Sequence, residues 1–337
     1  MPLFRSFINA SRSGRRTTQS GKRLGRGTII QYEQAYRLLS QFETDRNTRI
    51  EFSVVQRISS AQHRRLKKEW NLLRFQLTGF LYSDKRVYDQ YTGTVLKIIR
   101  TFCHYLINEK GLALGPYYKN LKVPVERFRP VVLSPDRLKQ LANDDLFEGG
   151  LTEAERKIRM ILLTGCMLGL RFSDLMKLKK EHLLNQGERS YIILTTGKTG
   201  TEVTIPLPER IRFQIEYNNN GGRYLLPRIS NSHFNSSVKK LIEKAGWVEP
   251  CPRFKQRQGK AIEQKKKGRT WRFCDHVTAH TMRRTAITCL LMMGVEEAVV
   301  RRLSGHSPGS KEFHKYVVLS QTYIDEKIRE AQEKLLL

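Results

Sequence analysis

Apolar residues three or four positions apart dominate the first third of the sequence. They recur at this spacing over residues 28–46, 62–81 and 88–109, with polar and charged residues between them. A repeat close to the helical period gives each helix one apolar face, which another element must cover. Gly111 and Pro116 end the third stretch. We therefore expect three amphipathic helices that pack together as a small helical domain.

The rest of the chain is mostly helical, with one clear β-hairpin. Residues 191–195 and 201–207 are rich in β-forming residues and flank the glycine-bounded turn 196–200. The apolar run 160–170 contains Gly169 and is too short to span a bilayer, so it predicts a buried helix. The predicted fold class is mainly α with a small β-hairpin or sheet.

Shifts in composition predict the domain boundaries. Residues 1–26 carry seven Lys or Arg and no acid, which is typical of a flexible basic tail. A helical domain over 27–123 follows, and prolines indicate a linker over 124–134. Residues 135–337 then form a second, α+β domain. Its first helix begins at Pro135, with Ser134 as the capping residue.

The net charge is the strongest indication of a partner. Lys and Arg number 61 against 32 Asp and Glu, which gives +29 at neutral pH. Such a surface attracts a polyanion, and nucleic acid is the commonest one. A ribosome-associated protein or a membrane-surface binder is the alternative. The stretch 253–272 holds nine Lys or Arg and one Glu and resembles an unstructured insertion. Its candidate DNA-binding residues are Arg253, Lys255, Arg257, Lys265, Lys266 and Lys267.

The five cysteines favour a reducing compartment. They are scattered without a Cys-x-x-Cys pair, which argues against a disulfide framework and against a structural zinc site. Cys274, Asp275 and His276 are adjacent but lack partners at metal-ligand spacing. The N-terminus has no continuous apolar segment, so we expect no secretory signal and a cytoplasmic location.

Two short motifs combine an arginine with a candidate orienting partner. Arg171 follows Gly169, and Asp174 three residues later could hold the guanidinium in one orientation. His280 and Arg283 lie one helical turn apart, so their common face could bind a phosphate. A surface ion pair and a solvated basic helix are the plain alternatives.

Three further residues gain meaning only in combination. Gly305 suits a helix end and would project His306 from the turn. Tyr316 follows in an aromatic segment, with Tyr323 as a second candidate, and Lys198 lies at the tip of the predicted hairpin. Taken singly, these are an ordinary capping histidine, a core tyrosine and a solvated lysine.

In this order, the motifs resemble the signature of the tyrosine recombinase (phage integrase) family, and especially integrases of mobile elements. The resemblance covers roughly residues 134–325. It rests on Arg171, Lys198, His280, Arg283, His306 and Tyr316. It implies a helical core-binding domain followed by an α+β catalytic domain. Ser304 stands where the family more often has Leu, a difference that we expect to be tolerated.

The resemblance implies a site-specific recombinase that cuts and rejoins DNA through a 3′-phosphotyrosine. Tyr316 would be the nucleophile, and the longer gap after His306 leaves Tyr323 open for this role. Arg171 and Arg283, planar and always charged, would bind the non-bridging oxygens.

The remaining roles also follow from the resemblance. Lys198 would protonate the leaving 5′-oxygen, His280 would act as base or orienting group, and His306 would hydrogen-bond the phosphate. The set implies no metal and no other cofactor, because arginine and lysine supply the positive charge.

The implied partners are a double-stranded recombination site and three further copies of the chain. Residues 321–337 form an amphipathic helix that would exchange between protomers of a homotetramer. An accessory DNA-bending protein would be a further partner, and no membrane is implied. The reaction would integrate, excise or invert a DNA element at the bacterial nucleoid.

Two other functions compete with this interpretation. Residues 281–303, with Gly294 between two short helices, resemble a helix-turn-helix, so a non-catalytic DNA-binding regulator is one alternative. A type IB topoisomerase, which uses similar chemistry, is the other.

Overall fold

The computed structural model divides the chain into two compact units. It describes residues 1–18, 21–51, 59–123, 130–197, 199–218, 222–307 and 309–335. The first unit comprises Met1–Phe128 and Arg253–Gln264, and the second comprises Arg129–Pro252 and Lys265–Leu337. Most of the expected linker, residues 124–129, lies outside the described residues.

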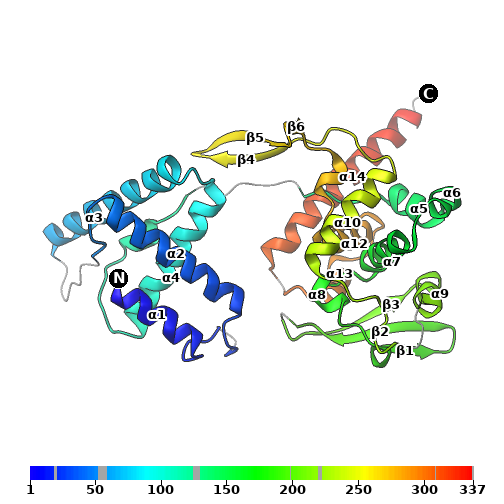
Figure 1. The fold of residues 1–337 in the computed structure, drawn as a ribbon, viewed down its shortest axis with the longest axis horizontal. Coiled ribbons are helices and arrows are strands. Elements are labelled where there is room, and N and C mark those ends of the chain that lie inside the picture. The colour runs from blue at the N-terminus through cyan, green and yellow to red at the C-terminus, as the bar shows by residue number, and fades with distance from the viewer. Residues whose placement is uncertain are drawn as a thin grey trace. The chain divides into compact units, whose positions relative to one another are not determined.

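The first unit is helical, as its apolar spacing predicts (Figure 1). Its core contains Leu39, Phe80 and Phe102, each fully or almost fully buried. Ser59 and Gln62 form a reciprocal capping box that begins α3. Its helices are α1 (Pro2–Arg12), α2 (Arg26–Asp45), α3 (Ser60–Gly79), the π-helical turn η1 (Phe80–Asp84), α4 (Asp89–Asn108) and the 3-10 turn η2 (Tyr117–Asn120).

The prediction of a flexible tail over residues 1–26 is wrong. Residues Pro2–Arg12 form α1. Phe4, Phe7 and Ile8 of this helix are buried in the core of the unit. The guanidinium of Arg16 lies 4.4 Å from the ring centroid of Phe7 and pairs with Glu109. Apolar residues at helical spacing anchor the segment, even though its charge is typical of a tail.

The expectation that residues 253–272 are an unstructured insertion is also wrong. They form a three-stranded antiparallel sheet with the order β4-β5-β6. Its strands are β4 (Arg253–Arg257), β5 (Lys260–Lys266) and β6 (Arg269–Thr270). The β4–β5 turn consists of Gln258 and Gly259, both at positive φ, which matches the twist of a two-residue hairpin. The structure groups this hairpin with the helical unit rather than with the predicted second domain.

The second unit is built around α7 and α12, which pack against each other. Thr152 and Glu155 form a capping box that begins α7, and Gly169 ends it at φ 62°. Gly165 leaves no room for a side chain, because a Cβ there would collide with Sδ of Met282. Its helices are α5 (Pro135–Asn143), α6 (Asp145–Gly149), α7 (Glu153–Leu168), α8 (Phe172–Leu175), the 3-10 turn η3 (Lys180–His182), α9 (Glu209–Asn218), α10 (Asn231–Lys244), α11 (Phe273–His276), α12 (Ala279–Met292), α13 (Glu297–Ser304) and α14 (Lys311–Leu335).

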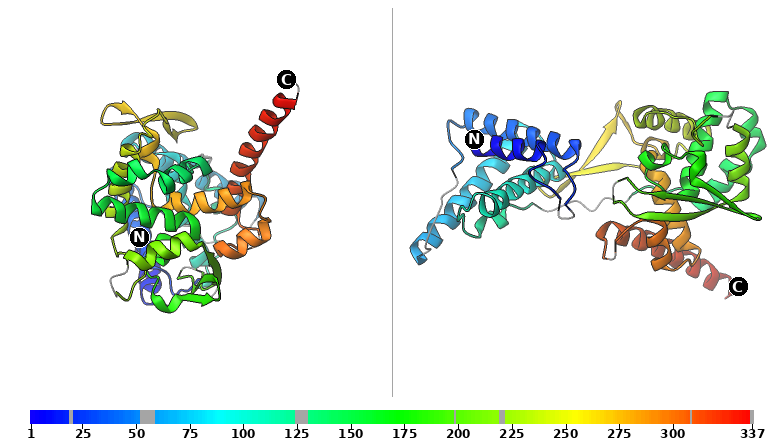
Figure 2. Two further views of the ribbon diagram at one scale, coloured as in Figure 1. Left: turned by 90° about the vertical axis from the view of Figure 1, so that its right-hand side faces the viewer. Right: turned by 90° about the horizontal axis from the view of Figure 1, so that it is seen from below.

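The predicted hairpin is confirmed as the strands β2 and β3 of an antiparallel sheet. Ile192, Leu194, Val203 and Ile205 alternate with exposed or half-buried neighbours and join the core. A third strand, β1, pairs with β2 and was not predicted. Figure 2 shows this sheet beside α9, and the last turns of α14 projecting from the second unit. The strands are β1 (Leu183–Gln186), β2 (Arg189–Thr195) and β3 (Glu202–Leu207).

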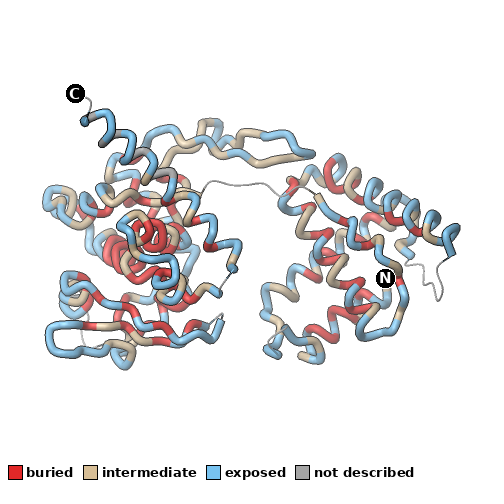
Figure 3. Tube along the Cα trace, turned by 180° about the vertical axis from the view of Figure 1, so that it is seen from behind, coloured by how far each residue is buried: buried red, intermediate tan, exposed pale blue. Residues whose placement is uncertain are grey.

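In each unit the buried residues gather in the interior and the outer helix faces are exposed (Figure 3). Ser134 caps α5 by accepting a hydrogen bond from the backbone N–H of Arg137, as predicted. Among the described residues, no helix combines the length and the apolar character that a membrane span requires.

Candidate active site

Arg171 is placed by the turn that ends α7. Gly169 adopts the left-handed conformation, and Arg171 becomes the N-cap of the short α8. Its Nη1 atom is buried and has no hydrogen-bond partner among the described residues. Within the described residues, the guanidinium of Arg171 does not form the predicted contact with the carboxylate of Asp174. Asp174 instead accepts a hydrogen bond from the backbone N–H of Gly197, at 3.1 Å.

Arg283 lies at the centre of the site and is only 2% exposed. Its guanidinium donates hydrogen bonds to the carbonyl oxygens of Gly169 (3.0 Å) and Ser304 (2.6 Å). Its Nη2 atom is also 3.2 Å from the ring nitrogens of His306. Burial, and then the charge of Arg171, lowers the pKa of Arg283 to about 10. The side chain therefore stays charged at neutral pH.

His306 is placed as the sequence predicts, with Gly305 at φ 61° ending α13. The hydroxyl of Ser304 is 2.8 Å from Nδ1 of His306 and also donates to the carbonyl of Val300. Ser304 thus orients the imidazole ring of His306. The sequence comparison with the family pattern, in which Leu is more common at this position, did not indicate this role. Burial, followed by the charge of Arg283, lowers the pKa of His306 to about 4.

His280, in the first turn of α12, is only partly withdrawn from solvent and lies near the charges of Arg171, Arg283 and Arg284. Desolvation, and then the charges of Arg284 and Arg283, lowers its pKa to about 4. Both imidazoles are therefore neutral at neutral pH. A neutral imidazole can donate one hydrogen bond and accept another, which suits it to a site that already holds several cations.

Tyr316 lies in α14 and is 5% exposed. Its ring centroid is 6.0 Å from that of His306 and 6.3 Å from that of Phe313. Arg284, which follows Arg283 on α12, interacts electrostatically with Tyr316. Arg284 therefore borders the site as well. Because the phenol is buried, it must move before it can reach a phosphate.

Sequence reasoning missed one acidic residue of the site. Glu312 lies one helical turn before Tyr316 on α14 and pairs with Lys315, 2.8 Å away. Its charge acts on His280 and Arg284. The four-residue spacing from Tyr316 is the sequence signal that could have indicated it.

The second unit thus brings together five of the six predicted site residues. Their charges act on one another, although they come from α8, α12, the turn after α13, and α14. Lys198 lies outside the described residues, and the side chain of Tyr323 is likewise not described. Within the described part of the chain, no group of three or more His, Cys, Asp or Glu is arranged to hold a metal ion. The cluster of cations beside a phenol suits the binding of a phosphate diester.

Several of the predicted DNA-binding residues have protein partners. Lys266 and Arg269 pair with the buried Asp275. Although burial raises the pKa of this carboxyl, hydrogen bonds from Arg269 and Lys266 hold it well below its usual range. Lys265 donates to Thr270 at 3.0 Å. The ion pair between Lys266 and Asp275 stabilises the fold. DNA contact by the predicted DNA-binding residues remains a prediction.

Comparison with known proteins identifies the family. A model of the phage integrase family matches residues 133–321, which is more than half of the chain. The chain belongs to the phage integrase family. This integrase-family chain is 28% identical over 197 residues to tyrosine recombinase XerA of Pyrococcus horikoshii, and the match covers 56% of each chain. It is 26% identical over 233 residues to tyrosine recombinase XerD of Shewanella oneidensis, with 67% of this chain and 71% of that protein covered.

Solved structures support the same fold for this integrase-family chain. A lambda integrase dimer bound to a COC′ core site matches with a TM-score of 0.58 at 12% identity, covering 94% of both chains. The Tn1549 transposon integrase in complex with a circular intermediate DNA matches with a TM-score of 0.58 at 14% identity, covering 98% of both chains.

Proposed function

We propose that this chain is a tyrosine-type DNA strand transferase that recombines DNA at specific sites. The observation that carries the proposal is the convergence of Arg171, Arg283 and His306 beside Tyr316. The Nη1 atom of Arg171, which has no hydrogen-bond partner in the described part of the chain, offers a donor for one phosphate oxygen.

In the proposed step, the phenolic oxygen of Tyr316 attacks the phosphorus of a DNA phosphodiester. The bond from phosphorus to the 5′-oxygen breaks, and a 3′-phosphotyrosine forms. The phenol loses its proton, and the leaving 5′-oxygen gains one. Arg171 and Arg283 neutralise the charge that develops on the non-bridging oxygens. Attack by a 5′-hydroxyl on the phosphotyrosine reverses the step, so rejoining requires no external energy source.

The other residues of the site support this step. Lys198 is proposed as the acid that protonates the 5′-oxygen, while His280 and His306 hydrogen-bond the reacting groups. Movement of Tyr316 out of its packing against Phe313 precedes the attack, because its side chain is buried.

A non-catalytic helix-turn-helix regulator fits the geometry less well. Such a protein reads DNA with residues at the start of its second helix. In this chain the second helix of that motif is α13, which begins at the acidic Glu297, and Arg301 of the same helix pairs with Glu297 at 2.9 Å. An acidic residue at the start of α13 disfavours contact with DNA phosphates, whereas the buried contacts of Arg283 with Ser304 and His306 have a clear use in strand transfer.

The proposed partners are a double-stranded recombination site and further copies of this chain. We propose a homotetramer in which the C-terminal part of α14 reaches a neighbouring protomer. A lambda integrase tetramer bound to a Holliday junction matches this chain with a TM-score of 0.54 at 13% identity, and an assembly of that kind motivates the proposal. An accessory DNA-bending protein and action at the nucleoid in the cytoplasm belong to the same proposal.

Covalent capture of DNA tests the function. The full chain is incubated with a randomised duplex library whose nicks let the cleaved fragment diffuse away, and adducts are separated on a denaturing gel. We expect an adduct from the wild type and from Tyr323→Phe, and none from Tyr316→Phe. An adduct formed by Tyr316→Phe would move the nucleophile elsewhere, and the absence of any adduct would favour the regulator.

Sequence dependence separates the recombinase from a type IB topoisomerase. Sequencing of the captured duplexes should yield one preferred site. Relaxation of supercoiled plasmid by a monomer, without a preferred sequence, would instead indicate the topoisomerase.

A further inference from the structure

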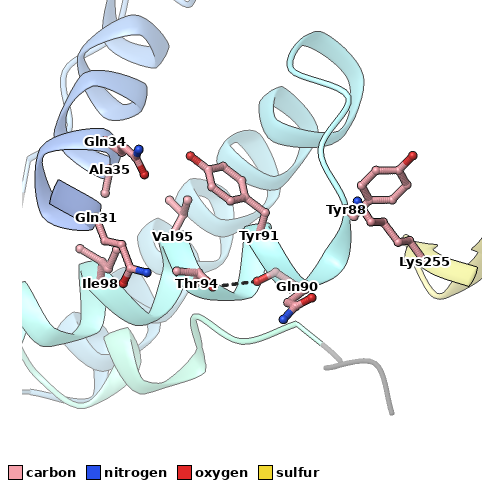
Figure 4. Close-up of a pocket in the computed structure, with 10 residues that line it drawn as sticks. All are labelled: Gln31, Gln34, Ala35, Tyr88, Gln90, Tyr91, Thr94, Val95, Ile98 and Lys255. Carbon is pink, nitrogen blue, oxygen red and sulfur yellow. Dashed lines mark hydrogen bonds between the residues drawn. The ribbon is translucent and has the colours of Figure 1, made fainter. Parts of the chain in front are cut away.

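The first unit contains a shallow hollow between α2 and α4 (Figure 4). Gln31 and Gln34 come from α2, Gln90 and Tyr91 come from α4, and all four are exposed. The hollow measures about 280 Å³. It is therefore smaller than most small-molecule sites, which range over about 300–1000 Å³. The side-chain amides of the three glutamines lie on two neighbouring helices. They are better placed to hydrogen-bond a large polar partner at the surface than to enclose a small ligand.

The floor of the hollow is apolar. Ala35, Val95 and Ile98 line it and belong to the buried core of the unit. Figure 4 shows Tyr91 and Val95 on α4, facing the α2 residues across the hollow. The surface therefore offers hydrogen-bonding amides beside a patch that can contact a methyl group.

The β4–β5 hairpin completes the rim. Lys255 lines the hollow, and its Nζ atom lies 4.5 Å from the ring centroid of Tyr88. The buried carboxylate of Asp89 holds the hairpin by accepting the backbone N–H groups of Gln258 (2.8 Å) and Gly259 (2.9 Å). A segment 169 residues away in sequence is thus fixed beside the start of α4.

The charges around the hollow favour an anionic partner. Among the residues that the structure describes, no acidic one lines the hollow. Arg37 follows Gln34 by three residues on α2, and Lys97 follows Thr94 by three on α4. Both basic residues are exposed and lie on the same helix faces as the lining residues. Glu33 of α2 is paired with Arg12.

We propose that this hollow reads A·T base pairs in the major groove of duplex DNA. A glutamine amide can bond to N6 and N7 of adenine, and an apolar patch can contact the methyl group of the paired thymine. Gln31, Gln34 and Gln90 are the reading residues, Lys255 contacts a phosphate, and Asp89 positions the hairpin. The major groove is wide enough to admit an α-helix. This inference rests on the proposed function, because it names the part of the substrate that the first unit recognises.

Selection by binding tests the proposal independently of cleavage. Duplexes with a randomised segment are selected for retention by a Tyr316→Phe chain, with or without Gln31→Ala, Gln34→Ala or Gln90→Ala. We expect A·T pairs at two or more positions of the selected site. Each glutamine variant should lower the preference at one of these positions by roughly 5- to 100-fold. Gln76→Ala, which replaces an exposed glutamine on α3, is the matched control and should leave the selected sequence unchanged.

Two further measurements identify the contacts. Replacing thymine by uracil at a selected A·T position removes the methyl group and should weaken binding several-fold at that position alone. Lys255→Ala should weaken binding to all sequences equally and reduce the slope of the salt dependence by about one.

The failures of this inference and of the proposed function are distinguishable. If every glutamine variant selects the same sequences as the parent chain, or if no A·T position is selected, the inference is overturned whether or not the wild type forms an adduct. Conversely, loss of an A·T position in a glutamine variant supports the base-reading site even if no adduct forms.

Discussion

At the scale of single residues, Arg283 organises the candidate active site. Its guanidinium contacts the turn before Arg171, the carbonyl of Ser304 and the ring of His306. A buried guanidinium with so many partners both orients its neighbours and supplies positive charge to the site. The same desolvation keeps the nearby imidazoles neutral, which makes the second unit sensitive to pH.

Acidification should destabilise the second unit through His306. The pKa of this residue is about 4 in the folded chain against an ordinary value of 6.5. Between these values the unfolded chain binds more protons, so stability is present at neutral pH and falls as the pH decreases from 6.5 to 4. The urea concentration at the midpoint of unfolding should fall as the pH decreases from 6.5 to 4. This decrease should be smaller for His306→Gln than for the wild type. Parallel curves would contradict the lowered pKa.

Release of Tyr316 should be slowed by its electrostatic interaction with Arg284. Arg284→Met removes the charge that interacts with the phenol, so we expect Tyr316 to move more readily and adduct formation to accelerate by roughly 5- to 10-fold. Single-turnover rates on a captured duplex measure this effect. Arg284→Lys, which keeps a cationic donor, should remain nearer to the wild-type rate. A slower reaction of the Met variant would place Arg284 among the groups that assist the attack.

At the scale of secondary-structure elements, the β4–β5 hairpin depends on one buried carboxylate. Asp89 accepts two backbone N–H groups of the turn. Burial and a hydrogen bond with Asp89 also raise the pKa of Tyr82 to about 12. The hairpin is therefore held by polar contacts at its tip as well as by the stacking of Lys255 and Arg257 on Tyr88.

Loss of this carboxylate should free the hairpin from the first unit. Asp89→Ala leaves the amides of Gln258 and Gly259 without their acceptor, at a cost of about 2–3 kcal/mol. Their hydrogen-exchange rates should therefore rise by roughly 30-fold or more. Asp84→Ala, which removes only the exposed pair with Arg46, is the control and should change them little. Unchanged exchange in Asp89→Ala would show that side-chain stacking alone fixes the hairpin.

Local signals in the sequence predicted most helices and much of the candidate site. The spacing of apolar residues indicated α2, α3 and α4, and the alternation around Val203 indicated β2 and β3. Gly169 and Gly305 marked the helix ends that place Arg171 and His306. These predictions succeed because each depends on residues within a few positions of one another.

Features that depend on distant partners could not be predicted in this way. The charge of the first residues obscured the helix that Phe4 and Phe7 anchor in the core. The docking of Gly259 on Asp89 joins residues 170 positions apart. The direction of Arg284 is set by the packing of α12 against α14, which no local pattern encodes.

At the scale of the whole molecule, we expect the net charge of +29 to dominate the proposed binding to DNA. A protein that neutralises several phosphates releases their counterions, so its affinity falls steeply as salt rises. The amides that we propose to read sequence are uncharged and should contribute nothing to this slope.

Binding to a duplex of arbitrary sequence should therefore weaken strongly with salt. If six to ten phosphates are contacted, affinity should fall by about 10³- to 10⁵-fold between about 50 and 200 mM salt. Fluorescence anisotropy of a labelled duplex measures this change. A nearly flat dependence would mean that the positive charge of the chain does not face DNA.

The residue that becomes joined to DNA can be identified directly. The captured adduct is digested with protease and nuclease, and the modified peptide is sequenced by mass spectrometry. We predict a nucleotide attached through its 3′-phosphate to the phenolic oxygen of Tyr316. Attachment to Tyr323 or to any other residue, or through a 5′-phosphate, would contradict the proposed mechanism.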